Sequence, residues 1–152
     1  KGTGCMSCMR GTSKMEVFMG KTLEDLGTQN SHWSVSSSMA NVWSLLPGSE
    51  LDRVVKLKLP SGNEEVVAIE MDGIQHFKAV DFFGGEEGFA ATQFRDRRKN
   101  DNCQIIRAHL LRIGYDVSND DYGNIVLAFF DRVAATPSVW QFQCVGKHYQ
   151  QN

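Results

Sequence analysis

The chain has 152 residues, which is enough for one domain and too few for two ordinary ones. Hydrophobic residues make up 41% and charged residues 22%, a balance that excludes wholesale disorder, collagen-like repeats and a disulfide-only miniprotein. No apolar run approaches the roughly 18 residues that a membrane-spanning helix needs, and the net charge of -2 excludes a uniformly basic nucleic-acid coat while leaving room for a local basic patch.

The chain opens with a glycine- and cysteine-rich segment that precedes a predicted helix. Residues 1–12 are expected to form a loop or knuckle, and residues 13–152 a single domain. A helix is predicted over residues 13–26, because apolar side chains recur there at helical spacing. Ser13 followed by Glu16 is a capping-box pattern, and Gly27 is a natural C-terminal stop. Residues 28–50 have no assignment from the sequence.

Two strands joined by a turn are predicted next. Over residues 53–59 apolar side chains alternate with Lys56 and Lys58, the pattern of a half-exposed strand. Residues 60–63 have the composition of a turn. Residues 66–71 form a more apolar strand, which is expected at the centre of a sheet. Together these segments predict a β-hairpin.

The remaining segments predict alternating helices and strands. A polar helix is expected over residues 91–102, a strand over 110–115, a helix over 125–135, and a last strand or extended tail over 139–145. This order predicts an α/β fold with a central mixed β-sheet flanked by helices.

The second strand of the predicted hairpin ends in two carboxylates. Glu70 and Asp72 are two residues apart, so on a strand their side chains leave the same face. Such carboxylates repel each other unless a cation lies between them, and their oxygens suit Mg²⁺ or Mn²⁺. Gly73 permits a sharp turn that would bring His76 to the same point, where an imidazole can accept or donate a proton. This set suits metal-assisted phosphodiester hydrolysis.

Each of these residues also has a simpler interpretation. Glu70 could pair with Lys56 or Lys58 across the hairpin, and His76 could be an ordinary surface histidine. Glu16 could act only as a capping residue of the first helix. Its place at the margin of the apolar stripe would nevertheless let its carboxylate reach the sheet edge.

Basic residues on the predicted helix 91–102 are candidates for nucleic-acid contact. Arg95, Arg98 and Lys99 share one helical face and could contact phosphates. The alternative is a solvent-exposed helix whose charges are paired internally by Asp96 and Asp101.

The four cysteines indicate the redox state of the cellular compartment and a candidate zinc site. They do not make a disulfide framework, and no signal-peptide pattern opens the chain, so a reducing, intracellular compartment is predicted. Cys5 and Cys8 have the spacing of half a zinc knuckle, which makes structural Zn²⁺ a candidate cofactor. The missing half would come from Cys103 or Cys144, or from residues preceding Lys1.

A family resemblance runs through about fifty residues. It is carried by residues 67–77 (VAIEMDGIQHF), 80–89 (VDFFGGEEGF), Thr92-Gln93, Arg95-Asp96, Lys99-Asn100, Cys103 and 110–115 (LLRIGY). In order and spacing these residues resemble nucleases of phage and large-virus type. Those nucleases are relatives of the very-short-patch-repair endonuclease in the PD-(D/E)XK, or restriction-endonuclease-like, superfamily, and some homing endonucleases share the domain. A weaker extension covers Cys5, Cys8 and Glu16.

The resemblance implies a restriction-endonuclease-like fold with the active site at the strand ends, and Mg²⁺- or Mn²⁺-dependent cleavage of DNA. Glu16, Glu70 and Asp72 would hold the metal. His76 would be the general acid or base, and Lys99 would steady the phosphate. The further positions that match the family motif are Gln75 and Asp96.

One position departs from the family. Its first hairpin strand usually carries an aspartate shortly before Leu-Pro, and anchoring on Leu59-Pro60 puts Lys56 at that position. An ammonium group there would repel a metal ion and could pair with Asp72. Asp52 would replace the missing carboxylate only if the strand register or a bulge moved it.

Two functional hypotheses follow. The first is a metal-dependent endonuclease acting on DNA. The second is a catalytically inactive nuclease fold that binds nucleic acid, RNA included, or serves as a structural subunit of a larger assembly. The RNA-binding domain abundant in apicomplexan proteins also resembles this fold. A site-specific nuclease of this size would need a separate recognition module or a homodimer, because little surface is left to read bases.

Overall fold

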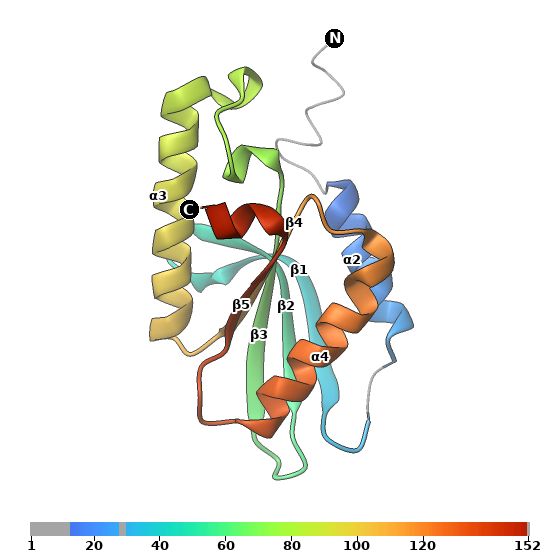
Figure 1. Cartoon of the computed structure of the whole chain (residues 1–152). Helices are drawn as coiled ribbons and strands as arrows, with labels where there is room; N and C mark the ends of the chain where they lie inside the picture. Colours follow the sequence, from blue (N-terminus) through green and yellow to red (C-terminus); the bar gives the residue numbers. More distant parts are fainter. Residues whose placement is uncertain (1–12, 28–29, 152) are drawn as a thin grey trace.

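The computed structural model describes residues 13–27 and 30–151 of the chain. Its five strands form one mixed sheet in the order β1–β2–β3–β4–β5 (Figure 1). The strands are β1 (Ser34–Leu46), β2 (Ser49–Lys58), β3 (Glu64–Asp72), β4 (His109–Gly114) and β5 (Phe142–Val145). The first three pair antiparallel, whereas β4 runs parallel to β3 and β5 parallel to β4. Parallel neighbours need long crossovers, and here each crossover contains a helix.

Helices cover both faces of the sheet (Figure 1). The helices α2 (Lys14–Asp25) and α4 (Tyr122–Ala135) pack on one face, in a core that includes Met19, Ile69 and Phe130. The long helix α3 (Gly85–Ile105) covers the other face, where Cys103 packs with Ala68 and Leu110. The short 3-10 helices are η2 (Ile74–His76), η3 (Asp81–Phe83), η4 (Asn119–Asp121) and η5 (Lys147–Gln151). The predicted α/β class, with a central mixed sheet flanked by helices, is confirmed.

Local sequence signals set the ends of α2. The Ser13 hydroxyl accepts a hydrogen bond from the Glu16 backbone N–H at 3.2 Å, and the Glu16 carboxylate accepts one from the Ser13 N–H at 3.3 Å. This is the predicted capping box. Gly27 follows with a φ of 85°, a conformation that favours glycine. The predicted helix over residues 13–26 is therefore confirmed to within one residue at each end.

The unassigned stretch 28–50 contains the whole of the long edge strand β1. Its pairing with β2 is interrupted by register shifts between Val35 and Ser37 and between Val42 and Leu46. These shifts, together with the solvent-exposed serines of an edge strand, remove the regular alternation that identifies a strand in sequence.

The other predicted elements are present with altered lengths. The strands expected over residues 53–59, 66–71 and 110–115 correspond to β2, β3 and β4, and β3 is central as expected. The helix expected over residues 91–102 extends from Gly85 to Ile105, because its first turn is glycine-rich and reads as loop in the sequence. The predicted tail 139–145 contributes only four residues of strand, Phe142–Val145.

No helix in the described ranges is long and apolar enough to cross a bilayer.

The packing of α4 on the sheet gives a stability prediction. Phe130 is 1% exposed and packs edge-on against Trp33, with ring centroids 5.2 Å apart. Phe130→Ala should lower the free energy of unfolding by about 3–5 kcal/mol, because it deletes a buried ring and leaves a cavity. Urea denaturation measures this. Leu127→Ala, at a 38% exposed site on the same helix, is the control and should cost less than about 1 kcal/mol; equal losses would contradict this account of the core.

Candidate active site

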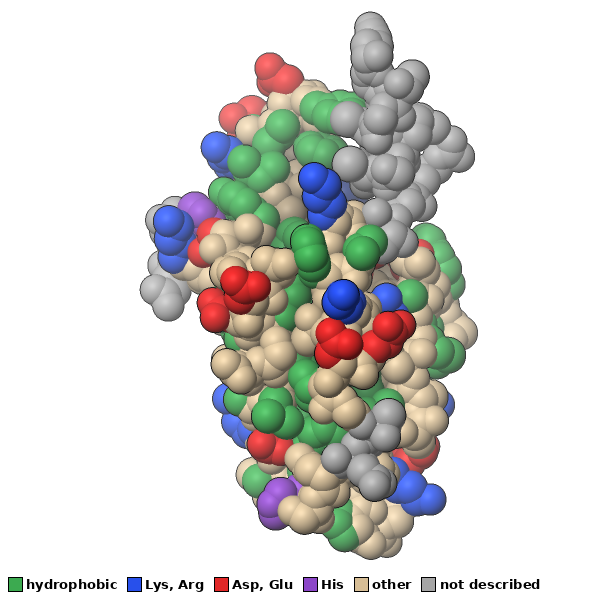
Figure 2. Space-filling view, turned by 90° about the vertical axis from the view of Figure 1, so that its right-hand side faces the viewer, with side chains coloured by type: hydrophobic (Ala, Val, Ile, Leu, Met, Phe, Trp, Pro, Cys, Tyr) green, Lys and Arg blue, Asp and Glu red, His purple; other side chains and the backbone are tan. Residues whose placement is uncertain are grey.

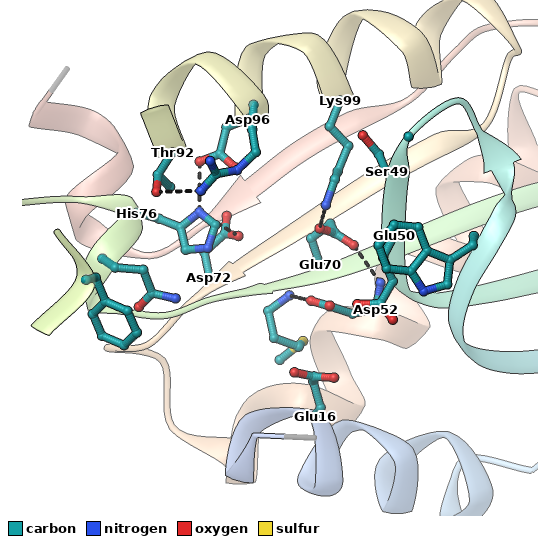
Figure 3. A pocket seen from close by; sticks show the side chains of 16 residues that line it. Glu16, Ser49, Glu50, Asp52, Glu70, Asp72, His76, Thr92, Asp96 and Lys99 are labelled. Carbon is teal, nitrogen blue, oxygen red and sulfur yellow. Dashed lines mark hydrogen bonds and ion pairs between the residues drawn. The ribbon is translucent and has the colours of Figure 1, made fainter. Parts of the chain in front are cut away.

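A cleft of about 530 Å³ lies where β2 and β3 meet α3, with α2 below it (Figure 3). Six acidic side chains line it: Glu16, Glu50, Asp52, Glu70, Asp72 and Asp96. The basic side chains lining it are Arg95 and Lys99, joined by His76. Lys99 and Asp96 come from α3, whereas Glu16 comes from α2 (Figure 3). The cleft therefore brings together side chains from α2, β2, β3, η2 and α3.

Asp52 and Glu70 are linked where the backbone ladder of β2 and β3 stops. The paired residues run from Lys58 opposite Glu64 to Arg53 opposite Ile69. Beyond that point, the Asp52 N–H donates to Glu70 Oε2 at 2.7 Å, and the Met71 N–H donates to Asp52 Oδ2 at 2.9 Å. Side-chain carboxylates thus take the place of backbone carbonyls, and both line the cleft.

The proximity of these carboxylates alters their protonation. Burial, followed by the charge of Glu70 and then that of Glu16, raises the pKa of Asp52 to about 8. Burial likewise raises the pKa of Glu70, although Lys99 and Arg112 oppose the shift. Figure 3 shows Glu16, Asp52 and Glu70 turned toward the same space. A cation placed there would relieve their mutual repulsion.

Lys99 partly supplies that positive charge. Its Nζ lies 2.7 Å from Glu70 Oε1, and Glu70 is 3% exposed. Burial alone would lower the pKa of Lys99, but the Glu70 carboxylate more than offsets this, so the pKa is raised and the ammonium stays charged.

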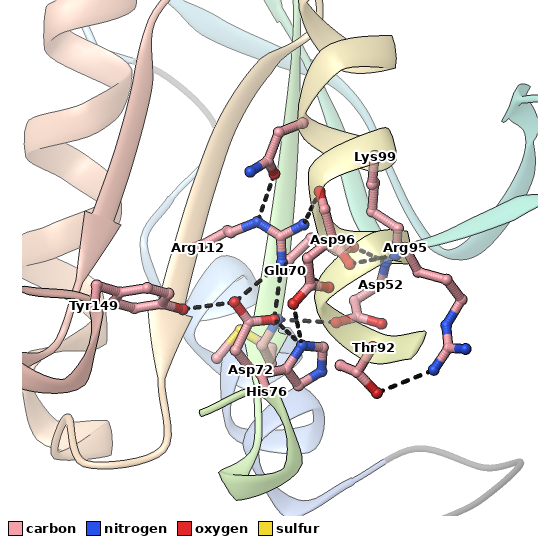
Figure 4. A network of polar contacts seen from close by, with 12 residues as sticks. Asp52, Glu70, Asp72, His76, Thr92, Arg95, Asp96, Lys99, Arg112 and Tyr149 are labelled. Atoms are coloured by element: carbon pink, nitrogen blue, oxygen red, sulfur yellow. Dashed lines mark hydrogen bonds and ion pairs between the residues drawn. The ribbon is translucent and has the colours of Figure 1, made fainter. Parts of the chain in front are cut away.

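A second network holds Asp72, which is 1% exposed (Figure 4). Arg112 Nη1 donates to both carboxylate oxygens at 3.0 Å, and the Tyr149 hydroxyl donates to Oδ2 at 2.6 Å. Burial alone would raise the pKa of Asp72, but Arg112 and then His76 bring it below its ordinary value. Burial and the Asp72 charge raise the pKa of Tyr149, so its hydroxyl remains a donor.

His76 connects this network to the cleft. Its Nδ1 lies 2.8 Å from Asp96 Oδ2 and 3.5 Å from Asp72 Oδ1. Burial alone would lower the pKa of His76, but the Asp96 hydrogen bond and the Asp72 charge raise it. Because Asp96 uses Nδ1, Nε2 is the ring nitrogen left to act on a substrate oxygen.

Several sequence-based interpretations change at this point. Glu70 bonds Lys99, so its proposed pairing with Lys56 or Lys58 is wrong; those lysines stand opposite Val66 and Glu64 instead. Asp72 pairs with Arg112 and not with Lys56. Among the described residues, Lys56 therefore forms no ion pair with Glu70 or Asp72.

The structure places Asp52 next to Glu70, four residues before Lys56 in the sequence. A carboxylate therefore lies beside Glu70, although the Leu59-Pro60 anchor puts Lys56 at the position where the family carries its aspartate.

Of the other predicted site residues, Glu16, Arg95 and Asp96 line the cleft, and Arg98 packs on an aromatic ring of its own helix. Glu16 serves in the capping box and also lines the cleft, so the two interpretations are compatible. Arg95 lines the cleft and bonds Thr92, whereas the Arg98 guanidinium lies over the Phe94 ring at 5.8 Å. Asp96 bonds His76, so the expectation that it pairs within the helix is wrong.

The predicted zinc ligands are not brought together in the described part of the chain. Cys5 and Cys8 lie outside it. Cys103 is buried on the inner side of α3, where burial and the Glu70 charge raise the pKa of its thiol to about 11, and Cys144 is exposed on β5. A raised pKa disfavours the thiolate that binds zinc. The zinc hypothesis for Cys5 and Cys8 stays a prediction.

Sequence reasoning missed three residues that organise this site. Asp52 was set aside because of the turn anchor. Arg112 lies in an otherwise apolar strand, and a buried arginine in such a run signals an acidic partner. Tyr149 carried no signal, because only the tertiary fold brings η5 back to Asp72.

The chemistry of the site fits a divalent cation at Asp52, Glu70 and Glu16. Their oxygens are the hard ligands that Mg²⁺ and Mn²⁺ prefer, and their charges are not fully compensated. As they stand, the described residues contain no group of three His, Cys, Asp or Glu side chains already arranged to hold a metal ion. Asp72, with both oxygens engaged, is a poorer ligand than Asp52.

Comparison with known proteins gives no match to any family model, curated protein or solved structure.

The raised pKa of Asp52 predicts a pH-dependent stability. A carboxyl whose pKa is 3.8 when unfolded and about 8 when folded binds more protons in the folded state between those values. The free energy of unfolding should therefore fall as pH rises through this range. Asp52→Asn should reduce that fall, as measured by denaturation at several pH values. Asp101→Asn, on the exposed side of α3, should keep the wild-type profile; identical profiles for wild type and Asp52→Asn would contradict the assignment.

The Arg112–Asp72 pair gives a second prediction. Arg112→Leu should lower the free energy of unfolding by about 3–5 kcal/mol, because Asp72 would stay buried without its cation. Adding Asp72→Asn to that variant should recover part of the loss, and a double-mutant cycle measures the coupling. Arg97→Leu, at an exposed position on α3, is the control. A loss for Arg112→Leu no larger than that of the control would contradict the pairing.

Proposed function

We propose that this chain is a metal-dependent nuclease that hydrolyses phosphodiester bonds of DNA. The observation that carries the proposal is the convergence of Asp52, Glu70 and Glu16 on one part of the cleft, with a pKa of about 8 for Asp52. Buried carboxylates that share one space, with raised pKa values, are typical of a cation-binding site. The resemblance of residues 67–115 to very-short-patch-repair-like nucleases of the PD-(D/E)XK superfamily supports the same reading.

Asp52, Glu70 and Glu16 would hold Mg²⁺ or Mn²⁺. When bound, such an ion polarises a phosphate oxygen and lowers the pKa of water. The hydrogen bonds between Asp52, Glu70 and the backbone of β2 and β3 fix the two carboxylates before any ligand arrives.

His76 and Lys99 supply the remaining chemistry. Asp96 holds the proton on His76 Nδ1 and orients the ring, and the raised pKa of His76 favours the imidazolium. His76 is therefore better suited to donate a proton to the leaving oxygen than to remove one from water. The Lys99 ammonium, now on Glu70, is within the same cleft and would stabilise negative charge on the phosphate.

Arg95 and Arg98 are the proposed contacts to neighbouring phosphates. Arg95 lines the cleft and Arg98 lies one turn further along the same helix. Such contacts position the strand without reading its sequence.

The alternative is a catalytically inactive nuclease fold that binds nucleic acid or builds a larger assembly. The Lys99–Glu70 ion pair favours it, because an internal ammonium partly neutralises the acidic cluster without a metal ion. The two functions predict different results when Asp52 is replaced: a nuclease loses DNA cleavage, whereas an inactive fold shows no cleavage with or without Asp52.

Cleavage assays separate them. The purified chain incubated with plasmid and single-stranded DNA in Mg²⁺ or Mn²⁺ should cut, and Asp52→Asn or Glu70→Gln should reduce the rate by more than about 100-fold through loss of several kcal/mol of transition-state stabilisation. Asp101→Asn should cut at the wild-type rate. Folded wild-type protein that binds DNA but cuts neither substrate would favour the inactive fold, and equal rates in all variants would point to a contaminating nuclease.

A further inference from the structure

The charge of the cleft limits how it can hold a polyanion. Of its six carboxylates, Glu70, Asp72 and Asp96 contact Lys99, Arg112 and His76 respectively, which leaves the other three without an ion-pair partner among the described residues. Figure 2 shows one face of the molecule, where acidic and basic side chains are interspersed and no continuous basic band appears. Contacts to phosphates dominate the binding of duplex DNA. The cleft and this face therefore offer few unpaired basic side chains for such contacts.

The same cleft carries exposed aromatic surface. Trp43 on β1 lines it and is 62% exposed, although a tryptophan is among the costliest side chains to leave in water. Its neighbour Val42 pairs with Leu51, the residue before Asp52, so Trp43 comes from the strand next to Asp52 and lines the same cleft. Phe83 lines the cleft from η3 and stacks on Phe82, with ring centroids 5.1 Å apart.

The size of the cleft matches an unpaired nucleotide better than a duplex. Its volume of about 530 Å³ is that of a site for a small ligand. A paired and stacked base has its faces covered, whereas an unpaired base can stack on an aromatic ring, an interaction that depends little on sequence.

We propose that the cleft binds single-stranded DNA, with a base stacked on Trp43 and the adjacent phosphate presented to Asp52 and Glu70. This inference rests on the proposed nuclease function and names its substrate class. Stacking supplies the affinity that the acidic cleft cannot obtain from phosphates, and Phe83, which lines the cleft and stacks on Phe82, provides a second aromatic surface for a further base.

Tryptophan fluorescence tests the contact directly. Of the three tryptophans, Trp33 is buried and Trp140 is half-buried with its indole N–H bonded to the Ala108 carbonyl oxygen, so Trp43 is the one open to a base. In the His76→Gln background with Mg²⁺, which keeps the three proposed metal ligands and removes the proposed general acid, a short oligodeoxythymidylate should quench the fluorescence to saturation. A hairpin-free duplex of equal length should not, and Trp43→Phe should abolish the quenching.

Affinity measurements complete the test. Trp43→Ala should weaken binding of the single strand by about five- to 150-fold, the range found when base-stacking aromatics are removed. Ile105→Ala, at a 76% exposed apolar site on α3 outside the cleft, should leave affinity unchanged. Equal affinity for duplex and single strand, or unchanged affinity in Trp43→Ala, would overturn the inference.

The two proposals fail separately. Metal-dependent cutting by the wild type, with duplex and single strand cut equally well and Trp43→Ala unimpaired, would leave the nuclease standing and refute the single-strand preference. Quenching and affinity changes as expected, with no cutting by the wild type, would refute the nuclease and retain the single-strand site.

Discussion

The arrangement of this protein depends on two buried carboxylates at the end of its central strand. Glu70 and Asp72 leave the same face of β3 and are almost fully buried, so each requires a cation. Lys99 reaches Glu70 from α3, and Arg112 reaches Asp72 from β4. These two contacts fix α3 and β4 against β3. They also divide the acidic residues into two networks: the charge of Asp72 is compensated by Arg112, whereas the charges around Glu70 are only partly compensated by Lys99.

That division explains how the two carboxylates differ in role. Asp72 is held ionised by Arg112 and Tyr149, and its charge adds to that of Asp96 in favouring the protonated form of His76. Glu70 shares its environment with Asp52 and Glu16, and one ammonium does not balance the three carboxylates. The proposed catalytic cation belongs to this second group. His76 lies between the groups, with Asp96 and Asp72 favouring its protonated form.

The strong periodic signals of the sequence predicted the β2–β3 hairpin, the central strand, β4 and the two amphipathic helices. Edge strand β1 was not predicted, because register shifts interrupt its alternation of apolar and polar residues. The position of Asp52 beside Glu70 was not predicted either, because one sequence does not show where the pairing of β2 with β3 ends. The spacing of Glu70 and Asp72 correctly predicted a shared face. The same spacing could not predict that Arg112 and Tyr149, forty and seventy-seven residues away, donate hydrogen bonds to Asp72.

The central claim is that Asp52 and Glu70 form a cation site, and Mn²⁺ binding tests it most directly. Electron paramagnetic resonance of free Mn²⁺ at neutral pH should show one ion bound by the wild-type chain, with binding lost in Asp52→Asn and in Glu70→Gln. Binding should persist in Asp72→Asn if that variant remains folded, because Asp72 belongs to the other network. Equal Mn²⁺ binding by the wild type and Asp52→Asn, or loss in Asp72→Asn alone, would contradict the account.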